Sequence, residues 1–262
     1  MLYIVATPIG NLKEITNRAV EVLQDVDYIA CEDTRTSRVL LDHYGINKKL
    51  VSYHKFNENK ASEDIIKDLK NGLNIAIISD AGMPGISDPG AVIINDAIKE
   101  EIEYTVVSGP SAFTNAFVLS GYPTPFTFIG FLPDINKKRY ELLDSFSKVN
   151  STLIFYCSPH DLHKDIADMY KVLGDREVCV VREISKKFEE VTFSTLARGF
   201  ESTLKGEFVV LVKYTDEKME IDEDKNMKTL LEMGLTKTEA SKVIAKLTGK
   251  SKSEVYKNAI RN

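Results

Sequence analysis

The sequence contains no tryptophan, only three cysteines, and no apolar run as long as the 18 or more residues that a membrane-spanning helix requires. Cys31, Cys157 and Cys179 are odd in number and far apart, which argues against a disulfide framework or a cysteine-based zinc site. We therefore expect buried thiols in the reducing cytoplasm, with no metal. The first residues, MLYIVATPIGN, lack a basic leading segment and are typical of a first strand rather than of a signal peptide.

The usual phosphate-binding motifs are also missing, since no G-x-G-x-x-G follows the first apolar stretch and no G-x-x-x-x-G-K-[ST] occurs. Three other loops with Gly and Pro follow apolar stretches: ATPIGNL (6–12), SDAGMPGISDPG (79–90) and SGPSAF (108–113). A single loop of this kind is more often a plain turn. Loops after parallel strands meet at one edge of the sheet, however, so we expect these three to converge on one cleft. They suit a nucleoside-like ligand held by backbone groups.

Apolar periodicity divides the chain into two α/β parts. In the first part we expect a mostly parallel sheet with helices on both faces, and its strands at 2–6, 27–31, 50–54, 74–79 and 104–108. Residues 115–135 are aromatic and contain several Pro and Gly, which predicts an irregular passage between domains. In the second part we expect strands at 151–157, 176–184 and 206–214, and helices at 163–174 and 193–203.

Charge is distributed unevenly along the chain. The formal net charge is −5. Residues 225–262 carry eight Lys and one Arg against three Glu, a balance of 9 − 3 = +6, so the preceding residues carry −5 − 6 = −11. Two capping boxes, Thr236-x-x-Glu239 and Ser251-x-x-Glu254, predict a basic helical hairpin there. The expected domains are therefore 1–115, 116–215, and a linker with the basic helical extension at 216–262.

Five segments, taken in order, closely resemble the ribosomal RNA small subunit methyltransferase I family of the tetrapyrrole methylase superfamily. They are MLYIVATPIGNLKEIT, CEDTRTSRVLL, SYHKFNE, SDAGMPGISDPG and VVSGPSAFTNAFVLSGYPTPFTFIGFLP. The resemblance covers residues 1 to about 213 and implies two α/β domains with S-adenosylmethionine bound in the cleft between them. It also implies a homodimer that methylates the ribose 2′-oxygen of one cytidine in the decoding region of small-subunit ribosomal RNA.

The resemblance also implies a set of cofactor contacts, carried over by motif: Ile9, Asp80, Met83, Ser111, Ala112, Phe155, Tyr156 and Glu207. The chain departs from the family pattern at Cys157, where an acidic residue is expected, and at Asp161, where a basic one is common. RNA contacts at 157–161 are therefore not carried over.

Methyl transfer to a ribose hydroxyl benefits from a general base within reach of the hydroxyl proton. The candidates are Glu32, Asp33, His54, and above all Asp80 and Glu183, although Asp80 could be occupied by the cofactor. Glu183, at the end of an expected strand, is our first choice. Its alternative role is an ion pair with Arg182 or Lys186.

Five side chains are candidates for contacts with RNA. Guanidinium groups suit bidentate contacts with phosphates, and Arg35 and Arg38 lie one turn apart in DTRTSR. The remaining candidates are His54, Lys186 and Lys187. Arg35 could instead pair with Asp33, and His54 could be an ordinary surface residue. Two other functions stay open: methylation of a tetrapyrrole in the same kind of cleft, and a nonenzymatic RNA-binding role in ribosome assembly.

Overall fold

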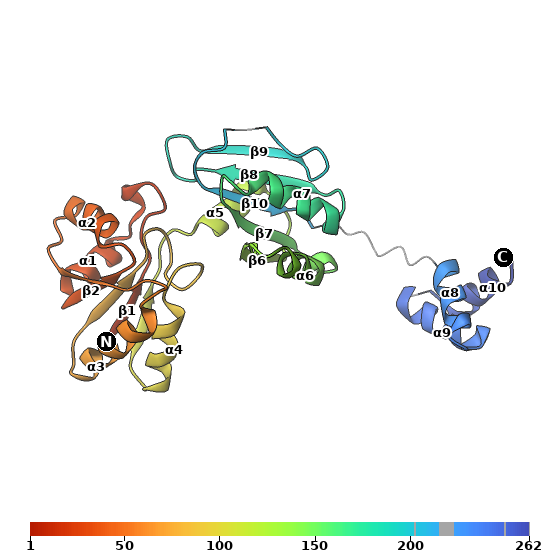
Figure 1. The fold of residues 1–262 in the computed structure, drawn as a ribbon, viewed down its shortest axis with the longest axis horizontal. Helices are drawn as coiled ribbons and strands as arrows, with labels where there is room; N and C mark the ends of the chain where they lie inside the picture. Colours follow the sequence, from red (N-terminus) through yellow and green to blue (C-terminus); the bar gives the residue numbers. More distant parts are fainter. Residues whose placement is uncertain (202, 215–222, 249, 262) are drawn as a thin grey trace. The chain divides into compact units, whose positions relative to one another are not determined.

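The computed structural model describes the chain except for residues 202, 215–222, 249 and 262 (Figure 1). It forms two compact units, Met1–Thr215 and Asp216–Asn262. The larger unit contains two five-stranded sheets. Among the described residues, every helix falls short of the length and apolarity that a bilayer crossing requires.

The first sheet is entirely parallel, with strand order β3-β2-β4-β1-β5. Its strands are β1 Leu2–Val5, β2 Tyr28–Cys31, β3 Lys49–Ser52, β4 Ile75–Ile78 and β5 Tyr104–Val107. The strands β2 and β4 are buried along their whole length, which explains their unbroken apolar sequences. The parallel arrangement brings the loops after all five strands to one edge of the sheet.

Helices cover both faces of this sheet (Figure 1). They are α1 Asn17–Asp25, α2 Thr34–His43, α3 Glu58–Lys70 and α4 Ala91–Lys99, with a 3₁₀ turn, η1, at Leu12–Glu14. Buried residues of α1 and α2 share one apolar cluster with the sheet. Those of α3 and α4 share the cluster on the other face.

The second sheet is mixed, with order β6-β7-β10-β8-β9. Its strands are β6 Phe126–Phe131, β7 Thr152–Cys157, β8 Glu177–Arg182, β9 Glu190–Thr195 and β10 Phe208–Val212. Only β6 and β7 pair in parallel, and β10 is antiparallel to both of its neighbours. The helices α6 Asn136–Ser147 and α7 Leu162–Leu173 pack on one face, and α5 Ala112–Ser120 packs on the other.

Two expectations from the sequence are wrong. Residues 115–135 are not irregular, because they hold most of α5 and all of β6; the Pro and Gly residues fall between these elements and at the bulge at Gly130. Residues 193–203 are not a helix. They begin with the end of β9, an edge strand whose residues 190–195 are rich in β-branched side chains, which favour strands. Because α5 packs on β7, β8 and β10, residues 112–115 belong with the second sheet.

The smaller unit is a bundle of three helices rather than a hairpin of two: α8 Glu223–Glu232, α9 Lys237–Thr248 and α10 Lys252–Arg261. The helix missed from sequence, α8, contributes Met227, Leu230 and Leu231 to the apolar cluster of the bundle. The first predicted capping box forms, since the Thr236 N–H and the Glu239 N–H each donate to the other's side chain, at 2.9 and 3.3 Å. Most of the expected linker at 216–224, and Gly249 between α9 and α10, lie outside the described residues.

A buried ion-pair network joins α6 to α7 beneath the second sheet. The Arg139 side chain, 1 % exposed, donates to the carboxylates of Asp165 and Asp168 and, through Nε, to the Pro133 carbonyl at 2.9 Å. The Tyr140 hydroxyl donates to Asp168 at 2.7 Å. The guanidinium is thus the counter-charge of Asp165, and it shares Asp168 with Lys171, whose Nζ lies 3.0 Å from that carboxylate.

We expect Arg139→Met to lower the free energy of unfolding of the larger unit by about 3–5 kcal/mol, because buried Asp165 loses its counter-charge and Asp168 keeps only its ion pair with Lys171. Urea denaturation followed by circular dichroism measures this. The control is Lys137→Met on the same helix, which removes only an exposed ion pair with Glu141 and should cost roughly 0.5 kcal/mol or less. Equal effects of the two changes on the free energy of unfolding would show that the buried network stabilises the unit no more than an exposed ion pair does.

Candidate active site

The three Gly- and Pro-containing loops meet at the carboxyl edge of the first sheet, as predicted. Thr7 and Gly82 form an isolated bridge with two reciprocal backbone hydrogen bonds, of 2.8 and 3.1 Å. The buried Thr7 hydroxyl also donates to the Ser79 carbonyl at 3.1 Å. The loop after β1 is thereby fixed to the loop after β4.

Glycine makes this close approach possible. A Cβ atom at Gly109 would lie 2.8 Å from the Ala6 Cβ, so only glycine lets the loop after β5 reach the loop after β1. At Gly90, with φ +153°, a Cβ would lie 2.8 Å from the Gly85 nitrogen. This contact folds the 79–90 loop back on itself, which brings residues 86–88 toward the same edge.

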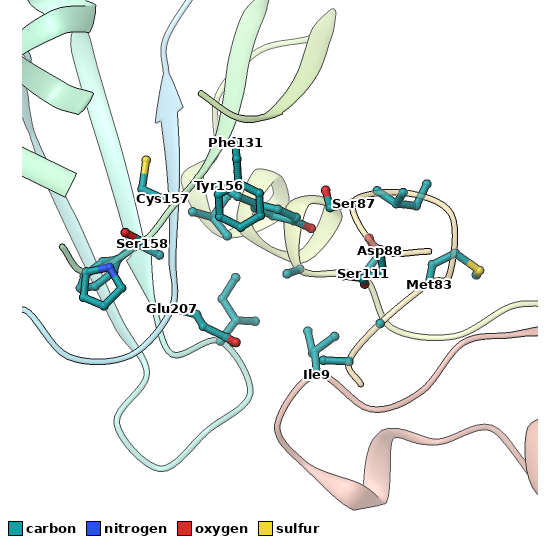
Figure 2. A pocket seen from close by; sticks show the side chains of 18 residues that line it. Ile9, Met83, Ser87, Asp88, Ser111, Phe131, Tyr156, Cys157, Ser158 and Glu207 are labelled. Carbon is teal, nitrogen blue, oxygen red and sulfur yellow. The ribbon is translucent and has the colours of Figure 1, made fainter. Parts of the chain in front are cut away.

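A cavity of about 300 Å³ opens beside these loops (Figure 2). Its lining comes from all three loops and from the second sheet: Ile9, Ala81–Met83, Ile86–Asp88, Ser111, Ala112, Phe131, Tyr156–Pro159, Ile184 and Glu207–Val209. Figure 2 shows Met83, Asp88 and Ser111 on one side, and Cys157, Ser158 and Glu207 on the other. Both sheets of the larger unit therefore contribute to one site.

The start of α5 forms part of the wall. Ser111 is the N-cap residue, yet its side chain makes no capping hydrogen bond. The Tyr156 hydroxyl accepts a hydrogen bond from the Phe113 backbone N–H, and burial raises the pKa of Tyr156 to about 12, so the phenol stays neutral. Because the N-terminus of a helix carries partial positive charge, this wall favours an acceptor or a carboxylate of a ligand.

Carboxylates dominate the polar part of the site. Burial, reinforced by the charge of Asp80, raises the pKa of Asp88, and a hydrogen bond from Ser79 opposes the shift only in part. Burial and the charges of Asp88 and Asp80 likewise raise the pKa of Glu32. No Lys or Arg occurs among the described residues that line the cavity. The site therefore suits a cationic ligand better than a polyphosphate.

Six of the eight expected cofactor contacts line this cavity: Ile9, Met83, Ser111, Ala112, Tyr156 and Glu207. Phe155 does not, because it is the strand neighbour of Tyr156 and points into the core on the opposite face of the sheet. Asp80 does not either: its carboxylate accepts the Asp33 N–H at 3.1 Å beside the cavity.

Glu183 also lies outside the cavity lining. Its carboxylate accepts hydrogen bonds from Lys186 Nζ and from the Glu207 N–H, both at 2.9 Å. Burial opposes ionisation of Glu183, but these hydrogen bonds outweigh it and hold its pKa below the ordinary value. A carboxylate held in this way is a weak base, and the geometry favours the ion pair with Lys186.

Lys186 and Lys187 differ in their surroundings. Lys186 bridges Glu183 and Glu207, at 2.9 and 3.1 Å, and its chain leaves no room for a Cβ at Gly10. It therefore joins the β8–β9 loop to the first loop of the site. Lys187 lies over the Phe188 ring at 5.6 Å.

The other expected RNA contacts do not all lie together. Arg35 is 89 % exposed at the start of α2 and holds Asp33 with a forked pair of hydrogen bonds. Arg38 donates to the Lys48 carbonyl, which precedes β3 and so lies toward the opposite edge of the sheet. His54 follows β3 and therefore lies at the same edge as Arg35.

Sequence reasoning missed Asp88, Phe131 and the 157–159 segment as cavity residues. The signal for Asp88 was present, since it is the second aspartate of the SDAGMPGISDPG loop. Nothing in a single sequence separates it from Asp80, because the fold of the loop decides which carboxylate faces the cavity.

Comparison with known proteins identifies the family. Residues 1–198 match the tetrapyrrole (corrin/porphyrin) methylases. A protein of Halalkalibacterium halodurans named ribosomal RNA small subunit methyltransferase I is 42 % identical over 97 % of this chain and 93 % of its own length. One of the same name from Mycoplasmopsis pulmonis is 47 % identical over 80 % of this chain and 96 % of its own length. The chain belongs to the ribosomal RNA small subunit methyltransferase I family.

Solved structures agree on the fold. The methyltransferase CobJ superposes with a TM-score of 0.63 at 15 % identity, over 82 % of this chain and 94 % of CobJ. A uroporphyrin-III C-methyltransferase from Thermus thermophilus gives a TM-score of 0.59 at 15 % identity, over 81 % of this chain and 93 % of its own. At this level of identity the likeness establishes the tetrapyrrole methylase fold alone.

The family uses S-adenosylmethionine as methyl donor, and the cavity residues fit this group. The cofactor carries positive charge on its sulfonium and amino groups, and Asp88 and Glu207 supply carboxylates on opposite sides of the cavity. Ile9, Met83 and Val209 offer apolar surface for the adenosine and the methionine chain. The N-terminus of α5 faces the same space for a ligand carboxylate.

We expect Asp88→Asn to weaken binding of S-adenosylmethionine about tenfold at pH 8, because a hydrogen bond to a charged partner contributes about 1.5–3 kcal/mol. Isothermal titration calorimetry measures this. Wild-type affinity should fall as the pH drops through the raised pKa of Asp88, because the protonated carboxyl no longer attracts a cation, and the variant should lack this fall.

The control is Asp80→Asn, which keeps an oxygen to accept the Asp33 N–H and should change the affinity less than about twofold. An equal loss of affinity in both variants would show that Asp80 also contacts the cofactor, and would refute our inference that only Asp88 of the two faces it.

Proposed function

We propose that this protein methylates the ribose 2′-oxygen of a cytidine in the decoding region of small-subunit ribosomal RNA, with S-adenosylmethionine as donor. The observation that carries the proposal is the 42 % identity, over 97 % of the chain, to a protein named ribosomal RNA small subunit methyltransferase I. The cavity supports it, since six of the eight residues expected to hold the cofactor line one space.

When bound, the cofactor supplies an electrophilic methyl group on a sulfonium sulfur. The contribution of the chain is position: displacement requires the attacking oxygen in line with the breaking bond, and holding it there supplies most of the rate enhancement. The locked loops at Thr7 and Gly82 fix one wall, and Tyr156 with α5 fixes the other. Asp88 and Glu207 would hold the positive end of the donor.

The charges of the site favour RNA over a tetrapyrrole as the acceptor. A polycarboxylate such as uroporphyrin would meet Asp88 and Glu207, and none of the described cavity-lining residues is a Lys or Arg. A nucleoside presents neutral base and sugar to the cavity and keeps its phosphates outside. Arg35, exposed at the same sheet edge, suits those phosphates.

The three-helix unit gives a second region for RNA. Residues 225–262, which form most of this unit, carry a balance of +6, against −11 for residues 1–224. Exposed lysines lie on both α9 and α10: Lys237, Lys242, Lys246, Lys252 and Lys257. Cationic side chains release counterions from a polyanion on binding, which gives affinity without sequence preference. We assign this unit to RNA docking.

We also infer that the protein acts as a cytoplasmic homodimer. Its three cysteines are all free and buried, as suits a reducing compartment. Val118 and Leu119 of α5 and Phe126 of β6 are exposed apolar side chains on adjoining elements, since the Phe126 ring packs on Phe117 of α5 at 4.6 Å. A second copy of the chain would cover them.

The proposal predicts transfer of label from S-adenosylmethionine to one cytidine ribose of small ribosomal subunits that lack the modification. Naked ribosomal RNA and a tetrapyrrole precursor are assayed alongside. Label on the tetrapyrrole alone would show that the protein is a methyltransferase whose acceptor is a tetrapyrrole and not RNA. Cofactor binding without transfer to any acceptor would favour the nonenzymatic role in ribosome assembly.

For the three-helix unit, we expect the triple change of Lys242, Lys246 and Lys252 to Gln to weaken RNA binding and to reduce the slope of log affinity against log salt by about 2, since each phosphate contact contributes roughly 0.7–0.9. Affinity for S-adenosylmethionine should not change. The control changes three exposed lysines of the larger unit, Lys67, Lys148 and Lys164, to Gln. Equal salt slopes for both triple variants would exclude specific docking by the unit.

A further inference from the structure

The turn after β3 carries an exposed aromatic ring that neither lines the cofactor cavity nor packs in the hydrophobic core. Phe56 is 95 % exposed, whereas the next most exposed large apolar side chain in the described part of the chain, Val118, is 79 % exposed. Leaving a whole phenyl ring in water gives up about 1.5–3 kcal/mol of the hydrophobic stabilisation that its burial would provide. A ring held in this way suits a partner that covers it.

The turn that carries Phe56 is fixed by hydrogen bonds. The Phe56 N–H donates to His54 Nδ1 at 3.3 Å, and the His54 N–H donates to Asn57 Oδ1 at 2.8 Å. The Asn57 side chain in turn donates to the Ser52 carbonyl at 3.0 Å, at the end of β3. The His54 ring lies at the edge of the Phe56 ring, with centroids 6.1 Å apart. The backbone that carries the ring is therefore fixed, which lowers the entropy cost of stacking on it.

This ring lies at the sheet edge that leads to the cavity. In the order β3-β2-β4, the strand before Phe56 is two strands from β4, whose loop supplies Asp88. Neighbouring strands are about 4.8 Å apart, so the two loops start roughly 10 Å apart. Glu32, which follows β2 between the two loops, is close enough to Asp88 for that charge to raise its pKa, after the larger effect of burial.

The charges around the ring match a nucleic-acid strand. Lys55 is exposed beside Phe56, and the exposed guanidinium of Arg35 follows the neighbouring strand β2. Its forked pairing with Asp33 orients this guanidinium through Nε and Nη2, and the remaining N–H donors are left for a phosphate. An aromatic face flanked by cations is the combination that binds single-stranded nucleic acid, with the base stacked and the phosphates at the cations.

We propose that Phe56 is a stacking platform for an unpaired base of the RNA substrate, close in sequence to the nucleotide whose ribose enters the cavity. The inference rests on the proposed function for the identity of the RNA, but the contact itself is a property of this turn. His54 and Asn57 hold the turn that carries the ring, and Lys55 and Arg35 receive the backbone of the stacked nucleotide.

Because the sequence contains no tryptophan, Phe56→Trp introduces a single fluorophore at the platform. Titration with the single-stranded RNA segment around the target cytidine should quench its fluorescence, since stacking on a base quenches indole emission. This readout needs no methyl transfer, so it tests the contact even where the proposed activity fails. Unchanged emission at RNA concentrations that saturate binding would overturn the proposal.

Kinetics with small subunits give the second test. Phe56→Ala should raise KM for the RNA about tenfold, because one base–aromatic stack contributes about 1–3 kcal/mol. Phe56→Trp should stay within about twofold of wild type, whereas Phe56→Leu should behave like the Ala variant, since bulk without a π face does not stack. The dissociation constant for S-adenosylmethionine should be the same in all variants.

Tyr170→Ala, which removes an exposed aromatic ring from α7, is the matched control and should leave KM unchanged. Wild type that fails to methylate RNA, together with quenching in Phe56→Trp, would reject the proposed function and keep the platform. Normal KM in Phe56→Ala would reject the platform. A shift in the sedimentation of Phe56→Ala with unchanged KM would assign the ring to a protein interface instead.

Discussion

The site depends on one contact, the reciprocal pair of backbone hydrogen bonds between Thr7 and Gly82. Parallel strands bring their loops only to a common edge, and nothing in that arrangement makes separate loops act as one surface. The bridge fixes the loop after β1 to the loop after β4, and Gly109 lets the loop after β5 press against Ala6. The first-sheet wall of the cavity is therefore held in place by contacts between backbone segments.

The charges of the larger unit are separated in a way that matches the two ligands. Carboxylates face the cavity, at Asp88 and Glu207, where a sulfonium cofactor needs negative charge. Cations lie outside it, at Arg35 and Lys55 along the same sheet edge. Lys186 pairs with both Glu183 and Glu207, so these three side chains together keep a net negative charge beside the cavity.

The sequence predicted the first sheet and the convergence of its loops because each strand there is a short apolar run, and β1, β4 and β5 are each followed by a loop that contains Gly and Pro. It was less informative in the second sheet. There β6 lies among Pro residues, and β9 is an edge strand with an exposed Phe193, so neither shows the pattern of a buried strand. Similarly, α8 was missed because its apolar residues, Met227, Leu230 and Leu231, form a core only when they pack against α9 and α10.

Within the site, the limit was the choice between neighbouring candidates. Motif resemblance selected both Phe155 and Tyr156, although adjacent strand residues point to opposite faces and only one of them can face the cavity. It also selected Asp80 rather than Asp88. The turn held by Gly85 and Gly90 reverses the loop and brings Asp88 to the cavity, and such a reversal is a tertiary contact that the motif does not reveal. Sequence therefore located the loops, while packing decided which side chains they present.

The same packing has an electrostatic consequence. Burial raises the pKa values of Glu32, Asp80 and Asp88, and repulsion adds to the shift, from Asp88 and Asp80 at Glu32, from Asp80 at Asp88 and from Asp33 at Asp80. A carboxylate whose pKa is raised on folding binds more protons in the folded than in the unfolded state. Its contribution to stability therefore falls as the pH rises from the ordinary carboxyl pKa through the raised one. Near neutral pH the three charges oppose folding of the protein without ligand, and a bound cation offsets them. Binding of a sulfonium cofactor is thus coupled to the stability of the loops that hold it, because the repulsion it relieves lies within those loops.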